Sequence, residues 1–306
     1  MNSVFSQFGQ LVISPAFLLL YDQVSSLLDE AALTWLENSL SSVAVGDRRA
    51  LATAFSLAPR KVGKASLCPA GANSQRADAI DPGWNFSAWS VDQAARTLLL
   101  LAFPSNDKAQ YRQAIIQLLD YADISERVAL YQSLPILPHA ESFTAQAIEG
   151  VRSSMTAVFE AIALRNPYPK IYFDQLAWNQ MVLKALFEGS PLYLIDGLDD
   201  RANADLAAML VAYAHERWSA GRSVSPELWR SVGPFAQGAM VADLRRVLKE
   251  NDPMQQEAAA LACYTSAEAR SLLADRPGFI QQIESRELNW QRIGSQLHQQ
   301  ESSYAR

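Results

Sequence analysis

The side chains best suited to binding or catalysis gather between Asn166 and Ala236. Within this stretch the sequence DQLAWNQMVLKALFEG predicts a helix whose apolar stripe contains Trp178, with Asn179 and Lys184 off the centre of that stripe. An amide and a lysine beside a packed aromatic ring can bind a polar ligand. They can equally cap a neighbouring helix, which is the interpretation that the general pairing of buried polar groups favours.

A second group of such side chains lies near the end of the helix predicted over 203–220, where His215 and Arg217 follow each other closely. Trp229 and Arg230 lie on the short helix predicted next. Aromatic and arginine side chains are common anchors of binding surfaces, although each of these could instead belong to the core. The candidate ligand or partner contacts are therefore Trp178, Asn179, Lys184, His215, Arg217, Trp229 and Arg230.

Several kinds of chemistry lack the residues they need. The sequence has no glycine-rich phosphate loop and no GxSxG nucleophile motif. His139, His215 and His298 are remote from one another, and Cys68 and Cys263 form no CxxC pair, so no zinc site is predicted. The balance of 26 Lys and Arg against 32 Asp and Glu argues against a nucleic-acid partner. We expect no metal and no cofactor, and we assign no catalytic residue.

Helices are predicted to position these side chains, because apolar residues recur at spacings of three and four along most of the chain. The loop residue Asp47 is a suitable N-cap, and Pro59 is expected to end the helix that follows it. The predicted helices span residues 22–42, 47–57, 90–101, 107–120, 125–134, 141–165, 174–188, 203–220, 226–232, 239–250, 253–266, 268–274 and 279–299.

The fold is predicted to be all-α, with antiparallel helical hairpins stacked as a short HEAT-like α-solenoid. Most predicted connections are short, which favours antiparallel neighbours. Two stretches also resemble each other: LLDYADI followed by SERVALYQSL, and VLKENDP followed by MQQEAAALACY. In both, an acidic turn leads into a second helix, as in stacked repeats. A single irregular helical bundle is the alternative.

Composition suggests three regions. Residues 1–58 form an N-terminal helical segment, residues 59–89 a long loop rich in Pro, Gly, Ala and Ser, and residues 90–300 a helical-repeat domain that contains the block at 166–236. The apolar N-terminal run lacks the preceding Lys or Arg of a signal peptide and is too short to span a bilayer. We therefore expect a cytoplasmic protein without a transmembrane segment; membrane-surface binding through Val4–Tyr21 is a weaker hypothesis.

The block at 166–236 resembles the EboA family of bacterial proteins through NPYP, AWNQMVLKALF and YAHERW followed by GR and SPELWR. The resemblance implies a place in small gene clusters linked to secondary-metabolite traffic, including movement of a sunscreen-pigment precursor in cyanobacteria. It implies partners encoded in the same metabolite cluster, and no catalytic residues are carried over from the family.

Two hypotheses follow. The first is a non-catalytic helical-repeat protein that supports metabolite assembly or traffic by docking partner enzymes or holding a small metabolite. The predicted helices at 174–188, 203–220 and 226–232 would build its concave face.

The second hypothesis is an enzyme acting on a small metabolite or a sugar phosphate. His215 or Glu216 would serve as general base or acid, while Lys184, Arg217 and Arg230 would bind an anion. Catalysis requires these side chains to converge in one pocket.

Overall fold

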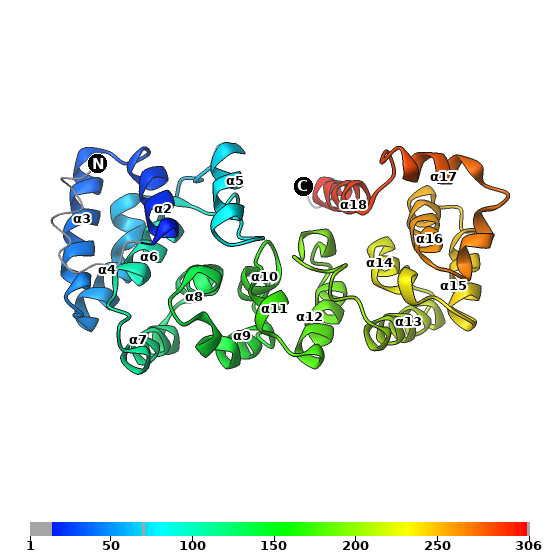
Figure 1. Ribbon diagram of the computed structural model, residues 1–306. Coiled ribbons are helices and arrows are strands. Elements are labelled where there is room, and N and C mark those ends of the chain that lie inside the picture. The colour runs from blue at the N-terminus through cyan, green and yellow to red at the C-terminus, as the bar shows by residue number, and fades with distance from the viewer. Residues whose placement is uncertain (1–13, 69–70, 305–306) are drawn as a thin grey trace. The chain divides into compact units, whose positions relative to one another are not determined.

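The structure is a computed structural model that describes residues 14–68 and 71–304 (Figure 1). These residues contain no β-strand, and one isolated backbone bridge joins Ser66 to Ser90. The all-α prediction is confirmed. The α-helices are α2 (Pro15–Ser25), α3 (Glu30–Ala44), α4 (Arg48–Val62), α5 (Gly71–Ile80), α6 (Val91–Ala102), α7 (Lys108–Tyr121), α8 (Ile124–Ser133), α9 (Thr144–Val151), α10 (Thr156–Ala163), α11 (Tyr168–Tyr172), α12 (Gln175–Glu188), α13 (Ala204–Ser219), α14 (Trp229–Val232), α15 (Ala239–Val247), α16 (Pro253–Thr265), α17 (Pro277–Glu284) and α18 (Trp290–Tyr304). Short 3-10 helices connect them at η2 (Leu134–Ile136), η3 (Ala140–Phe143), η4 (Leu192–Leu194), η5 (Pro226–Leu228), η6 (Gly233–Phe235) and η7 (Ala269–Leu273).

Side-chain caps begin many of these helices. An aspartate or asparagine oxygen accepts a hydrogen bond from a backbone N–H of the first turn, which would otherwise have no partner. Such caps explain why the predicted starts of α7, α8, α12, α13 and α16 lie within a residue or two of the observed ones. The capping residues are Asp29, Asp47, Asp107, Asp123, Asp174, Asn203 and Asp252.

Pro59 does not end its helix, contrary to the prediction, because α4 continues to Val62. A proline inside a helix leaves the carbonyl four residues earlier without its usual N–H donor. Here that carbonyl belongs to Phe55, and Arg96 Nε from α6 donates a hydrogen bond to it at 2.9 Å. A tertiary contact therefore supplies the hydrogen bond that the proline removes.

Three of the predicted long helices are broken. The stretch 22–42 is divided by Asp29, which caps α3 by accepting from the Ala32 N–H at 2.8 Å. Residues 141–165 form η3, α9 and α10 instead of one helix. Residues 279–299 divide into α17 and α18 at Arg286, whose φ of 63° ends a helix.

The stretch 59–89, predicted to be a loop, is largely structured. It contains the end of α4 and all of α5, and its last part buries three aromatic rings. Trp84 lies 5.2 Å from Phe86 and 6.3 Å from Trp89, measured between ring centroids. The small residues of this stretch gave no local signal of the helix or of the aromatic cluster, because both depend on contacts with the rest of the chain.

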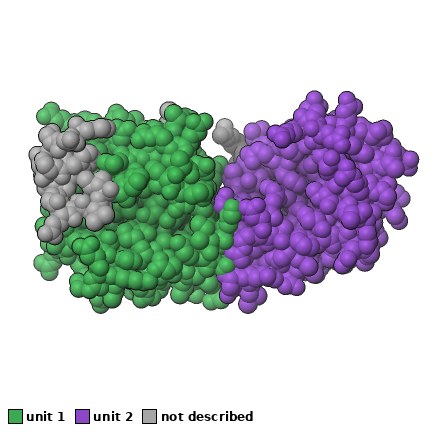
Figure 2. All heavy atoms as spheres, viewed as in Figure 1, with its two compact units in different colours: residues 1–173 green, residues 174–306 purple. Residues whose placement is uncertain are grey.

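The chain divides into two compact units, Met1–Phe173 and Asp174–Arg306 (Figure 2). In each unit helices pack mainly on helices near them in the chain. In unit 1, α3 packs on α4, α4 on α6 and α8 on α10; in unit 2, α12 packs on α13, α13 on α14 and α15 on α16. All seven candidate contacts lie in unit 2.

In the part of the chain that the structure describes, no helix is both long and apolar enough to cross a membrane. The N-terminal run Val4–Tyr21, on which the membrane-surface hypothesis depends, lies mostly outside the described residues; its last part is in α2.

Candidate functional site

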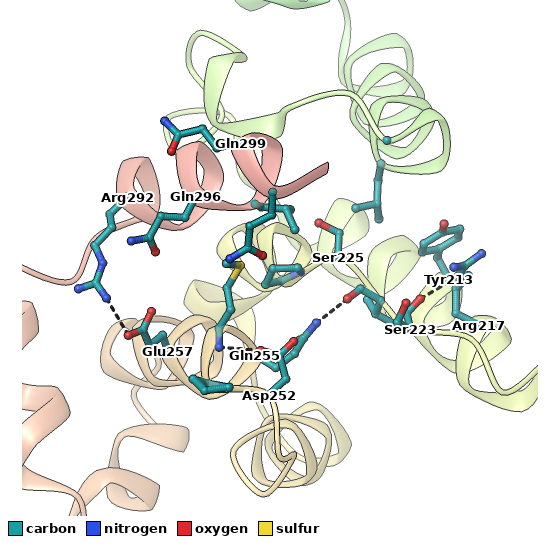
Figure 3. A pocket seen from close by; sticks show the side chains of 18 of the residues that line it. Tyr213, Arg217, Ser223, Ser225, Asp252, Gln255, Glu257, Arg292, Gln296 and Gln299 are labelled. Atoms are coloured by element: carbon teal, nitrogen blue, oxygen red, sulfur yellow. Dashed lines mark hydrogen bonds and ion pairs between the residues drawn. The ribbon is translucent and has the colours of Figure 1, made fainter. Parts of the chain in front are cut away.

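Unit 2 contains a cavity of about 910 Å³. Its walls are the end of α12, the second half of α13, the loop 223–225 with the start of η5, the start of α16, and α18 (Figure 3). Ligand sites of small molecules typically measure 300–1,000 Å³. The side chains labelled in Figure 3 are Tyr213, Arg217, Ser223, Ser225, Asp252, Gln255, Glu257, Arg292, Gln296 and Gln299.

Arg217 supplies a positive charge at one end of this cavity (Figure 3). It lies in the last turn of α13, and its Nε donates to the carbonyl oxygen of Ser223 at 3.0 Å, which fixes the guanidinium. No carboxylate of the described residues pairs with it. The other cationic lining residue, Arg292, is paired with Glu257 at 2.9 Å. Arg217 can therefore pair with a ligand's anionic group, since a guanidinium binds carboxylate and phosphate well.

Gln255 fixes the loop that borders the cavity. Its side chain on α16 is 6% exposed, and its Nε2 donates to the carbonyl oxygen of Val224 at 2.6 Å. Together with the Arg217 hydrogen bond to Ser223, this contact holds two successive carbonyls of the loop. The cavity wall is thus set by two side chains from different helices.

The same loop borders a smaller hollow of about 300 Å³. Trp218, Arg222, Arg246 and Glu250 contribute to its lining. The Arg246 guanidinium lies 4.0 Å from the centroid of the Trp218 ring, a cation–π contact. Burial raises the pKa of Glu250, an effect that the nearby Arg246 partly offsets.

The wall formed by α18 is held by a buried carboxylate. Glu227 is 2% exposed and accepts hydrogen bonds from the backbone N–H groups of Leu192 at 3.2 Å and Tyr193 at 2.6 Å. Nε2 of His298, on α18, lies 3.0 Å from the same carboxylate. Gly294 packs directly on the Tyr193 ring. These contacts attach α18 to η4 and η5.

The two candidate tryptophans belong to the core. Trp178 and Trp229 are both fully buried, so neither offers a surface to a partner. The Arg201 guanidinium lies 4.8 Å from the centroid of the Trp178 ring. The Trp218 ring stacks on the Trp229 ring, with 5.8 Å between the two centroids. For Trp178, the apolar stripe at helical spacing was the sign of this structural role.

Asn179 and Lys184 are engaged within unit 2. Asn179 is 3% exposed and exchanges two side-chain hydrogen bonds with Asn203, the N-cap of α13, at 2.9 and 3.1 Å. Lys184 forms a salt bridge with Glu188, one turn later on α12, with 3.4 Å between Nζ and Oε1. The capping role considered for the amide matches these contacts.

His215 is exposed and Arg230 is largely buried, and each has an acidic partner in unit 2. His215 Nε2 is 3.0 Å from Asp243 Oδ1, and its ring stacks on Trp218 at 5.6 Å. Arg230 forms a bidentate salt bridge with Asp199, in which Nε donates to Oδ1 at 2.6 Å and Nη2 donates to Oδ2 at 2.7 Å. Of the seven candidates only Arg217 lines the 910 Å³ cavity.

The described residues hold no cluster of three or more His, Cys, Asp or Glu suited to a metal ion. Cys263 is buried in α16, and burial raises the pKa of its thiol to about 12. The thiol is therefore protonated near neutral pH and is a poor nucleophile.

The remaining lining residues were missed because they come from distant helices. Gln255, Arg292 and Gln296 lie on α16 and α18, outside the block at 166–236. Nothing in their spacing links them to Arg217. Only the buried, hydrogen-bonded position of Gln255 distinguishes it from an ordinary surface glutamine.

The fold and the cavity define an all-α protein with a polar, ligand-sized site in its second unit. A family model described as metabolite traffic protein EboA matches residues 16–233. The chain therefore belongs to the EboA family, which confirms the resemblance seen in the sequence. The match includes α12, α13 and η5 of the cavity, whereas α16 and α18 lie beyond it. No curated protein and no solved structure matches the chain.

Proposed function

We propose that the protein serves metabolite traffic by holding a small anionic metabolite in the 910 Å³ cavity of unit 2. The observation that carries this proposal is the fixed guanidinium of Arg217 at the cavity wall, which has no carboxylate partner among the described residues. A buried or partly buried cation favours an anion that completes its hydrogen bonds.

Holding a metabolite fits these contacts better than docking through the predicted surface. Trp229 is fully buried, and Arg230 is already paired with Asp199. Proteins encoded in the same metabolite cluster would act as donors and recipients of the ligand in this proposal. A HEAT-like stacking of hairpins would supply the scaffold, an arrangement supported by packing between helices close in the chain.

The test is recovery of the ligand with the protein. The full chain is purified from its native host without denaturation, and small molecules are extracted and identified by mass spectrometry. Ser225→Phe fills the cavity from a residue whose side chain makes no capping hydrogen bond. The matched control is Ser219→Phe, at an exposed site on α13 outside the lining.

A compound enriched with wild type and with the Ser219 variant, but about tenfold depleted with Ser225→Phe, supports the proposal. Equal recovery from all three proteins would show that the compound binds elsewhere. Recovery of no compound from a folded wild type would count against metabolite holding.

A further inference from the structure

Unit 1 contains a separate small pocket of about 220 Å³. It is lined by the segment 85–89, by Gln132 of α8, by one face of α10 and by residues 164–166. All of these lie inside the range 16–233 matched by the family model. The pocket is therefore part of the region that defines the family, whereas half of the unit 2 cavity lies beyond it.

One wall of this pocket is held in a strained backbone conformation. Arg165 has a φ of 51°, a left-handed conformation that costs free energy for any residue with a β-carbon. The end of a helix does not explain it, since Leu164 separates Arg165 from α10 and is extended. The turn instead directs Asn166 into the core, where its amide donates to the carbonyl oxygen of Ala161 at 2.9 Å. Glycine or asparagine would make this turn with less strain.

The strained residue Arg165 is the one cationic residue among the described residues that line the pocket. No carboxylate of the described residues pairs with the Arg165 guanidinium. Glu160 also lines the pocket, but it already has an interaction of its own. The turn serves the burial of Asn166, but it does not require an arginine, and a guanidinium in a pocket binds carboxylates.

The rest of the pocket is partly apolar and partly unsatisfied. Trp89 is 3% exposed and is held edge-on against Trp84 and Phe86, so it forms a rigid wall. Ala157 and Ala161 of α10 add a flat apolar surface. The buried side-chain oxygen of Gln132 accepts no hydrogen bond from the described residues; as an acceptor it would not bind a carboxylate, so the binding of an anion rests on Arg165. The pocket is too small for a drug-sized ligand.

We propose that this pocket is a second binding site, which takes a small monocarboxylic acid with a compact apolar body. The carboxylate pairs with Arg165, and the apolar body lies between Trp89 and the alanines of α10. Arg165 supplies the positive charge of the site from its strained position. The site is independent of the metabolite cavity in unit 2.

Benzoate is the probe, because it has one carboxylate on a small flat ring, and benzamide is its neutral control. Binding to the full chain is measured by ligand-observed NMR and calorimetry. We expect benzoate to bind with a Kd on the order of 1 mM, as suits a fragment of this size, and benzamide to bind at least about tenfold more weakly.

Variants separate binding from stability. Arg165→Gly removes the charge and relieves the strain, so benzoate binding falls by about tenfold or more while the melting temperature stays level or rises by a few degrees. Arg286→Gly is the matched control. It relieves a positive φ of 63° at an exposed arginine outside the pocket and leaves benzoate binding unchanged.

The result also distinguishes the two proposed sites. Arg217→Gln in the unit 2 cavity should leave benzoate binding intact. Loss of binding in Arg217→Gln but not in Arg165→Gly would assign the probe to unit 2 and overturn the second site. Equal binding of benzamide, or no benzoate binding to the wild type at 10 mM, roughly ten times the expected Kd, would overturn it as well.

Discussion

Replacing Glu227 by glutamine should loosen the attachment of α18, which forms one wall of the unit 2 cavity. The Glu227 carboxylate accepts three hydrogen bonds, from two backbone N–H groups and from His298. A glutamine of the same size keeps one acceptor oxygen and turns an NH₂ group toward at least one of these donors. The substitution therefore removes at least one hydrogen bond and places two hydrogen-bond donors, the glutamine NH₂ and an N–H group, against each other in a buried site.

The expected loss follows from these contacts. A hydrogen bond to a charged acceptor contributes about 1.5–3 kcal/mol, and a buried unpaired donor costs about 1–3 kcal/mol. We expect Glu227→Gln to lower the free energy of unfolding of unit 2 by about 3 kcal/mol. At roughly 3 °C for each kcal/mol, the melting temperature of unit 2 falls by about 10 °C.

Urea denaturation followed by tryptophan fluorescence, together with calorimetry, measures this change. Glu216→Gln is the matched control, because Glu216 is exposed on α13 and its replacement should change stability by less than about 0.5 kcal/mol. If Glu227→Gln costs no more than the control, the carboxylate does not hold α18, and the reasoning about this wall is refuted.

Three further predictions concern the packing of each unit. Arg96→Met leaves the Asp92 carboxylate buried without its cation and removes the donor to the Phe55 carbonyl that Pro59 leaves unpaired. Urea denaturation of unit 1 should show a loss of about 3–5 kcal/mol in the free energy of unfolding, most of it recovered when Asp92 is also made apolar. Gly294→Ala places a methyl group against the Tyr193 ring and should destabilise unit 2 by about 1–3 kcal/mol, although alanine favours helices. In a Tyr193→Ala background the same Gly294→Ala change should cost little or nothing, which a double-mutant cycle measures. Asp123 caps α8, and the hydrogen bond that it accepts from the Glu126 N–H is the main cause that lowers the pKa of Asp123 below the ordinary 3.8. The stabilisation from the ionised cap is therefore complete above pH 3.8 and is lost as the pH falls through the lower folded-state pKa. Urea titrations at pH 5 and pH 2 should show that Asp123→Asn loses less stability on acidification than the wild type does.

Local signals in the sequence were sufficient for much of the helical architecture. Asp107, Asp174 and Asn203 lie just before apolar helical patterns and cap the helices that follow, as expected. Pro59 misled the prediction because its effect depends on Arg96, which lies far along the chain. Local propensity describes where helices begin, whereas tertiary contacts decide whether they continue.

The candidate site was harder to predict for a related reason. The aromatic residues that made the block at 166–236 conspicuous are largely core residues, as Trp178 and Trp229 show. The cavity depends on the meeting of α13 with α16 and α18, and a single sequence contains no signal of that meeting. Arg217 was identified because it combines a charge with a position at the end of a helix, but its lack of a carboxylate partner could be seen only in the structure.

The most direct test of an anion held by Arg217 is native mass spectrometry of the full chain purified from its host. Wild type and Arg217→Gln are compared with Arg245→Gln, an exposed arginine on α15 that does not line the cavity. We predict a non-covalent adduct on the wild type and on the Arg245 variant, and its loss from Arg217→Gln. An adduct that persists in Arg217→Gln, or a folded wild type with no adduct, would contradict the proposal.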